Sequence, residues 1–169
     1  AKIAGKPVQV AWTRADEFFY DTFRPATAVN IKSGITDAGK IVSWDYNIYG
    51  MGSRGADLFY DVPHHRTTVY QNLQGNEKMH DLGTGPWRAP DNNANSFARE
   101  SHIDVMAAKA GMDPLEFRLK NIADKKMQGV LKAAAEKFGW TAAKAPSGRG
   151  FGLACGSDVG VPVALMAEV

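Results

Sequence analysis

Two arginines occupy sequence contexts that could fix the direction of a positive charge. Arg24 follows the acidic and aromatic run ADEFFYDTF and precedes Pro25. A proline disfavours helical backbone in the residue before it, so Arg24 is expected in extended backbone with a restricted guanidinium direction. Such a residue could face a ligand. A salt bridge to Asp21 or Glu17 is the structural alternative.

Arg88 lies between Trp87 and Ala89 in the stiff stretch LGTGPWRAPDNN, directly ahead of a predicted helix. The first amides of a helix have no intrahelical acceptor, so this end attracts anions. A rigid loop at this position could aim backbone N–H groups at an oxygen of a ligand. The alternative is a helix start held by packing of Trp87, and local physics alone favours this alternative.

Histidines and cysteine offer no metal site. His64 and His65 are adjacent, so in an extended segment their rings point to opposite sides. His80 and His102 have no ligand partner one helical turn away, and a metal site needs three or four convergent ligands. The single Cys155 excludes an internal disulfide and any multi-cysteine centre. The sequence therefore predicts no metal bound directly by side chains.

Composition excludes two further classes of protein. Lys and Arg total 20 against 18 Asp and Glu in 169 residues, and no basic run is present. Nucleic-acid binding needs a concentrated basic surface, so we expect no nucleic-acid partner. No apolar run approaches the length that spans a bilayer, so we expect no membrane-spanning segment. Residues 1–169 are expected to form a single domain.

Strand-like alternation dominates the first half of the chain. PVQVAWTR at 7–14 alternates, as does IVSWDYNIY at 41–49, where one face carries Val42, Trp44, Tyr46 and Ile48. TAVNIKSGI at 27–35 and the turn TDAGK predict an antiparallel hairpin with 41–49. RTTVYQNL at 66–73 predicts a further strand.

Helical periodicity follows from Asn93. An apolar stripe over the first helix is formed by Ala94, Phe97, Ala98, Ser101, Val105 and Ala108. Asp113 and Pro114 start a second helix, and a third runs from Met127 to Phe138 and stops at Gly139. Strand patterning returns after APSGRG at 145–150. The prediction is an α+β fold, a mostly antiparallel sheet with about three helices packed on one face.

Three ordered motifs carry a family resemblance. WTRADEFFYDTFRPATAVNIK, GPWRAPDNNANSFARESHID and DPLEFRLKN resemble the large molybdopterin-binding subunit of the xanthine dehydrogenase and aldehyde oxidase family. Within that family, the sequence most resembles the branch formed by the beta subunits of isoquinoline 1-oxidoreductases. The resemblance covers nearly all of this chain but only a middle slice of the family's subunit. The chain therefore resembles an internal fragment, part of a molybdenum cofactor-binding domain.

The resemblance implies an oxidoreductase that hydroxylates an aldehyde or N-heterocycle with oxygen derived from water. It implies a molybdenum-pterin cofactor in the molybdopterin cytosine dinucleotide form, and an iron-sulfur small subunit that removes the electrons. The residues leave the location open between cytoplasm and periplasm, and the analogy with the isoquinoline 1-oxidoreductase group favours the periplasm. The family's upstream glutamine motif and downstream Gly-Glu motif are missing here, so the isolated chain is expected to be inactive and to hold no cofactor.

Site residues transfer from the family only where the motifs match. Arg24 lies ten residues after Arg14, the spacing of a family arginine on the substrate side of the site, so the resemblance makes Arg24 catalytic. The fixed charge of a guanidinium suits the role of favouring negative charge that develops on the substrate.

The resemblance also assigns the loop from Gly85 to Ala89 to the cofactor. Trp87 and Arg88 match the first two positions of the family's FRGFGG loop, in which the arginine amide faces the molybdenum centre. The cofactor-binding residues so implied are Gly85, Trp87, Arg88 and Ala89. Pro90 replaces the aromatic residue that stacks on substrate, which leaves the substrate class open.

A non-catalytic ligand-binding or subunit-interaction domain remains the alternative. Its ligand groove or subunit interface would use the aromatic side chains Trp12, Phe18, Phe19, Tyr20, Trp44 and Trp87. Trp12 and Trp44 lie on alternating runs, so core packing is favoured for these two.

Overall fold

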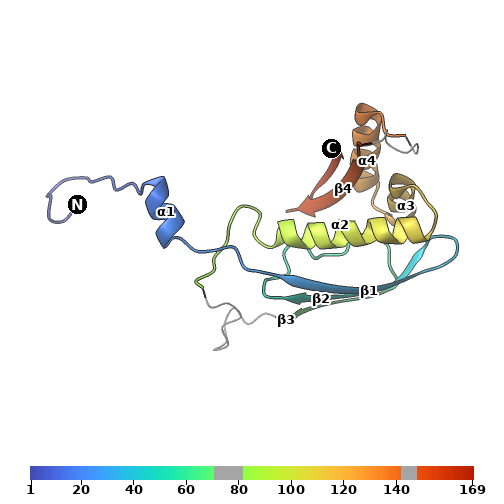
Figure 1. Ribbon diagram of the computed structural model, residues 1–169, viewed down its shortest axis with the longest axis horizontal. Helices are drawn as coiled ribbons and strands as arrows, with labels where there is room; N and C mark the ends of the chain where they lie inside the picture. Colours follow the sequence, from blue (N-terminus) through green and yellow to red (C-terminus); the bar gives the residue numbers. More distant parts are fainter. Residues whose placement is uncertain (71–81, 142–147) are drawn as a thin grey trace.

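The computed structural model describes residues 1–70, 82–141 and 148–169. Within them, a three-stranded sheet and a separate two-stranded sheet flank a long central helix (Figure 1). The predicted α+β class is confirmed, with the strands divided between two sheets. The elements are α1 (Arg14–Tyr20), β1 (Ala28–Ile35), β2 (Ile41–Tyr49), β3 (His64–Tyr70), α2 (Asn92–Lys109), α3 (Pro114–Asn121), α4 (Lys125–Phe138), β4 (Phe151–Asp158) and β5 (Val161–Glu168).

The β1–β2 hairpin forms as its alternation predicts. The strands pair antiparallel, with Ser33 opposite Trp44. Gly39 adopts φ 74° in the turn and donates its N–H to the Thr36 carbonyl at 2.8 Å. Trp44, Tyr46 and Ile48 of β2 are buried, so the face that the period of two selected is the core face.

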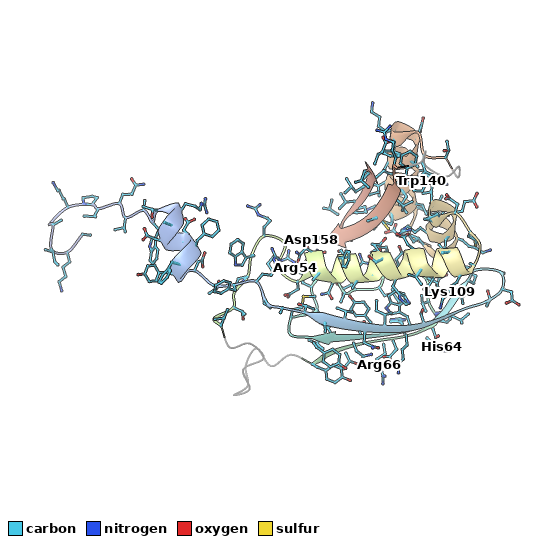
Figure 2. All side chains as sticks on the ribbon, in the orientation of Figure 1. Arg54, His64, Arg66, Lys109, Trp140 and Asp158 are labelled. Atoms are coloured by element: carbon cyan, nitrogen blue, oxygen red, sulfur yellow. The ribbon has the colours of Figure 1, made fainter. Side chains whose placement is uncertain are left out.

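β3 pairs with β2 in parallel, which the sequence did not indicate. It begins at His64, two residues before the predicted strand, whose last residues 71–73 lie outside the described part. The loop 50–63 carries the chain back across the sheet before β3 starts. His64 and Arg66 lie at the sheet, away from the central helix (Figure 2). The three-stranded sheet is therefore mixed.

α2 lies along one face of the three-stranded sheet (Figure 1). Its buried residues are Asn95, Arg99, Glu100, Ile103, Met106 and Ala107. The predicted apolar stripe is therefore wrong as the buried face: Phe97 and Val105 are 75% and 50% exposed. Half of the true buried face is polar, so apolar periodicity could not identify it.

α3 begins and α4 ends where the sequence predicts, and α4 begins at Lys125, two residues before the predicted Met127. The Asp113 carboxylate accepts hydrogen bonds from the amides of Leu115 and Glu116. Gly139 ends α4 in left-handed backbone with φ 75°. Phe117, Met127 and Leu131 bring these helices into the core shared with β2 and α2.

β4 and β5 form an antiparallel hairpin on the other side of α2 from the first sheet (Figure 1). The sequence predicted that strand structure returns after residue 150, and β4 begins at Phe151. Leu153 and Cys155 of β4 are buried in the common core. Arg54 and Asp158 meet where the 50–63 loop approaches β4 (Figure 2), and the guanidinium binds both carboxylate oxygens at 2.9 and 3.0 Å.

The N-terminal segment differs from its prediction. Residues 7–13 form no strand, and Val8, Val10 and Trp12 are 50%, 80% and 59% exposed. The strand at 7–14 and the core packing of Trp12 are both wrong, because no neighbouring strand or core surface receives the alternating side chains. The short helix α1 follows and lies apart from the main body (Figure 1).

α1 has a capping box as its start signal. The Thr13 hydroxyl accepts from the Asp16 amide at 3.2 Å, and Asp16 accepts from the Thr13 amide at 3.0 Å. None of its residues is buried. In the described part of the chain, no helix combines the length and the apolar character needed to cross a membrane.

Candidate functional site

Two segments far apart in sequence are joined by backbone hydrogen bonds at the site. The Phe23 amide donates to the Gly83 carbonyl at 2.9 Å, and the Gly85 amide donates to the Phe23 carbonyl at 3.0 Å. The indole Nε1 of Trp87 donates to the Thr22 carbonyl at 2.8 Å. The chain just before β1 is therefore held against the loop that precedes α2.

Gly85 is required for this close approach. A Cβ atom on Gly85 would overlap the Thr22 hydroxyl and crowd its Cβ and Cγ2 atoms. No comparable obstruction exists at Gly83, where an added Cβ meets nothing within 4 Å. The glycine of the GPWRAP stretch therefore permits the contact between the two segments.

Arg24 extends from the first segment to the second. Its Nη2 donates to the Arg88 carbonyl and its Nη1 donates to the Asn93 side-chain oxygen, both at 2.9 Å. The local salt bridge that the sequence left open is not formed, since Glu17 pairs with Arg14 instead. The two arginines that the sequence singled out are thus brought together.

The loop that follows Arg88 has unusual backbone geometry. Ala89 and Asp91 have φ values of 55° and 56°, a region that L-residues other than glycine rarely adopt. Asp91 precedes α2 without making a side-chain capping bond. Within the described residues, the amides of Arg88 and Ala89 have no hydrogen-bond acceptor. The loop therefore offers open N–H donors beside a helix N-terminus.

A cavity of about 300 Å³ lies beside these contacts. Its apolar lining residues include Pro25, Met51, Pro86, Trp87 and Pro90.

The site residues predicted from the sequence take different places around this cavity. Arg24, Gly85 and Trp87 are among its lining residues, and Arg88 and Ala89 are not. The Arg88 carbonyl instead accepts a hydrogen bond from Arg24. Their assignment to a cofactor remains a prediction.

A buried asparagine of α2, Asn95, holds the loop that follows β2. Asn95 donates from Nδ2 to the carbonyls of Gly52 and Arg54 at 3.1 and 3.0 Å, and its Oδ1 accepts from the Tyr46 hydroxyl at 3.0 Å. These bonds fix the loop that carries the buried Met51 side chain to the cavity wall. Sequence reasoning missed Asn95, because a lone asparagine within a helix gives no periodic signal.

A buried ionic network ties α2 to α3 and β4. The Glu100 carboxylate binds Arg99 Nε at 2.9 Å and Arg118 Nε at 3.0 Å, and it accepts from the Tyr60 hydroxyl at 3.1 Å and the Cys155 amide at 3.1 Å. Arg99 and Arg118 are 2% and 0% exposed. Three of these residues, Arg99, Glu100 and Arg118, belong to the quoted motifs, which therefore encode a scaffold as much as a site.

The same network suppresses ionisation of its neighbours. Burial, assisted by the negative charge of Glu100, raises the pKa of the Cys155 thiol to about 12. The same two causes raise the pKa of Tyr60. A thiol that stays protonated is a poor nucleophile, so Cys155 is a structural residue.

The three histidines that the structure describes, His64, His65 and His102, form no common metal site. His102 Nε2 lies 2.7 Å from the Ser33 hydroxyl, and burial lowers the pKa of His102. His65 Nδ1 lies 3.1 Å from the Val62 carbonyl, and His80 falls outside the described residues. Across the described ranges, no group of three or more His, Cys, Asp or Glu could hold a metal ion.

The aromatic set of the interaction hypothesis divides into two groups. Trp44 is 2% exposed and belongs to the core, as predicted. Phe18, Phe19 and Tyr20 of α1 are 74%, 77% and 66% exposed, and Tyr20 meets Trp12 edge-on with ring centroids 5.8 Å apart. Their exposure leaves an aromatic surface at the N-terminal segment.

The fold is shared with a solved aldehyde oxidoreductase. The aldehyde oxidoreductase from Desulfovibrio gigas superposes with a TM-score of 0.61 at 22% identity, over 85% of this chain and 19% of that chain. The chain belongs to the molybdopterin cofactor-binding domain family, because the model of that family matches residues 1–122. It is thus a cofactor-binding domain of the molybdenum hydroxylase family, which confirms the resemblance read from the three motifs.

Curated relatives agree with this assignment. A nicotinate dehydrogenase chain from Pseudomonas putida is 29% identical over 80% of this chain and 13% of its own length. The beta chain of isoquinoline 1-oxidoreductase from Brevundimonas diminuta is 26% identical over 98% of this chain and 23% of its own length. The present chain spans less than a quarter of either relative.

The residues at the loop fit the cofactor of this family. A pterin with a phosphate-bearing tail presents many anionic and carbonyl oxygens, which need N–H donors. The open amides of Arg88 and Ala89 are such donors, and the Arg24 guanidinium beside them adds positive charge.

Proposed function

We propose that the chain is an internal part of a molybdenum hydroxylase large subunit and supplies one wall of its active site. The contact of Arg24 with the Arg88 carbonyl supports this proposal most directly. It joins the predicted substrate-side charge to the predicted cofactor loop beside an apolar cavity. Arg24 is the catalytic residue of this wall, and Gly85, Trp87, Arg88 and Ala89 belong to the cofactor-binding loop.

Arg24 stabilises negative charge that develops on the substrate. Two of its five N–H bonds are used by the Arg88 and Asn93 oxygens, so three remain for a ligand. Trp87 and Met51 place apolar surface in the same cavity wall, and low polarity around a fixed charge strengthens this electrostatic effect.

The loop amides orient the cofactor. The N–H groups of Arg88 and Ala89 would hold molybdenum-pterin oxygens, in the molybdopterin cytosine dinucleotide form that the resemblance implies. When bound, that cofactor supplies the two-electron redox chemistry. Removal of the electrons is assigned to an iron-sulfur small subunit, and the location to the periplasm, by family analogy.

The substrate is an aldehyde or an aromatic N-heterocycle. Relatives named for nicotinate and isoquinoline support the second class. The apolar cavity wall formed by Pro25, Pro86 and Pro90 suits a flat ring. Because Pro90 cannot stack as an aromatic residue does, Trp87 is the aromatic side chain available on this wall.

The test compares the complete subunit, loaded and assembled with its partner, with the 169-residue chain alone. Molybdenum content is measured together with dye-linked oxidation of benzaldehyde and of isoquinoline. The complete enzyme should contain molybdenum and oxidise at least one substrate, whereas the isolated chain should do neither. Stoichiometric molybdenum in the isolated chain, or a complete enzyme that oxidises neither, would contradict the proposal.

A subunit-interaction role is the second candidate, favoured by the exposure of Phe18 and Phe19. Replacing both by serine in the complete subunit tests it. The interaction role predicts loss of assembly with the partner subunit on size-exclusion chromatography. Full assembly of the double variant would remove this candidate.

A further inference from the structure

We propose that Asn93 is a positioning residue, which holds the Arg24 guanidinium in place without offsetting its positive charge. The inference rests on the proposed function of Arg24. Asn93 belongs to α2 and Arg88 to the preceding loop, so hydrogen bonds to two different elements hold the Arg24 guanidinium. Nothing in the motif resemblance assigns a role to Asn93.

The two hydrogen bonds together fix the plane of the Arg24 guanidinium. Each terminal nitrogen of Arg24 donates to a different oxygen at 2.9 Å. A single hydrogen bond would leave the guanidinium free to rotate about that bond, and a second bond at the other nitrogen removes this freedom. Because Arg24 is exposed, packing alone does not restrain it.

The two acceptors of these hydrogen bonds leave the positive charge of Arg24 unneutralised. Both acceptors are neutral, one an amide oxygen and the other a backbone carbonyl. A carboxylate at position 93 would hold Arg24 equally well but would neutralise the field that a developing anion needs. Asp91 also lines the cavity, and among the described residues no carboxylate forms an ion pair with Arg24.

Within the described part of the chain, the Asn93 side chain forms a hydrogen bond with Arg24 and with no other residue. Asp91 precedes the helix, and the Asn93 amide group makes its one side-chain hydrogen bond with Arg24. The neighbouring Asn92 differs, because its Oδ1 accepts from the Ser96 hydroxyl at 2.8 Å within α2. Asn92 therefore provides a matched asparagine at the same helix end.

A double-mutant cycle in the complete, molybdenum-loaded subunit tests the proposal. Asn93→Ala should lower kcat by about tenfold, with a smaller change in KM, because a loosely held charge is less useful in the transition state. In an Arg24→Ala background, Asn93→Ala should have no further effect. Asn92→Ala should leave kcat unchanged.

Charge and geometry are separated by Asn93→Asp. It keeps an acceptor for Arg24, and we expect it to lower kcat at least as much as the alanine variant. A kcat equal to that of the native enzyme would overturn the neutral-acceptor argument.

Benzoate binding to the molybdenum-free subunit, measured by calorimetry, gives a readout that does not require turnover. Arg24→Ala and Asn93→Ala should each weaken benzoate, whereas Asn92→Ala should not. Additive losses of kcat, or unchanged benzoate affinity in Asn93→Ala, would overturn the role of Asn93. An Arg24→Ala enzyme with native turnover would instead overturn the proposed function itself, so the two failures can be told apart.

Discussion

Arg24 and Arg88, 64 residues apart in the sequence, meet through a hydrogen bond of 2.9 Å from Nη2 to the backbone carbonyl. The bond links a charge that the family resemblance assigns to the substrate with a loop that it assigns to the cofactor. It also polarises the Arg88–Ala89 peptide, because a carbonyl that accepts a charged hydrogen bond makes the attached N–H a stronger donor. The open Ala89 amide is that N–H.

Replacing Gly85 by alanine should disturb this arrangement. The new methyl group would overlap Thr22, so the segment around Phe23 must move away from the loop. We expect lower cofactor content in the complete subunit, measured as molybdenum per protein. Gly83→Ala is the control, since its methyl group meets open space. Equal molybdenum content in both variants would contradict a requirement for close approach at Gly85.

Glu100→Gln should destabilise the domain. The substitution leaves Arg99 and Arg118 buried without their shared carboxylate, and loss of one partner in a buried ion pair costs about 3–5 kcal/mol. The thermal unfolding midpoint of the complete subunit should fall markedly. Glu116→Gln, at an exposed position in the first turn of α3, should change it little. Similar midpoints for the two variants would argue against the scaffold role of Glu100.

Alkaline pH should weaken the fold through Cys155. Its folded pKa, about 12, lies above the ordinary value of 9.0, so the folded chain retains a proton that the unfolded chain releases. The stabilisation is complete below about pH 9 and is lost as the pH rises toward 12. Thermal midpoints measured across this range should fall less steeply in Cys155→Ala. Identical slopes in both proteins would exclude a contribution from the thiol.

The same burial predicts an unreactive thiol. At about pH 8, iodoacetamide should label Cys155 only after unfolding, because the thiolate is scarce and the sulfur is covered. Rapid labelling of the native protein, detected by mass spectrometry, would contradict this expectation.

Local signals predicted the elements whose own residues determine them. The β1–β2 hairpin follows from alternation and a glycine turn, and α3 and α4 follow from Asp113 and Gly139 at their ends. Non-local features were not predictable in the same way. The parallel pairing of β3 depends on where the 50–63 loop returns the chain, which no local pattern records.

The errors have specific physical causes. Val8, Val10 and Trp12 alternate, yet alternation forms a strand only where another strand supplies hydrogen bonds. The buried face of α2 was missed because Arg99 and Glu100 neutralise each other in the interior. Thr13 and Asp16 form a capping box that could have identified α1.

The candidate site was only partly accessible from sequence. Arg24 and the loop could be named from the motifs, but their contact and the part played by Asn93 required the structure. A side chain that acts through a partner 69 residues away gives no signal in its own neighbourhood.

The most direct measurement of the central claim is the turnover of Arg24→Ala in the complete, molybdenum-loaded subunit. Loss of a charge that acts in the transition state should lower kcat by about a hundredfold or more. The kcat is expressed per bound molybdenum, because loss of Arg24 also removes the hydrogen bond that polarises the Arg88–Ala89 peptide. The thermal midpoint should stay close to that of the native enzyme, because Arg24 is exposed. Native kcat in a fully loaded Arg24→Ala enzyme would contradict the account.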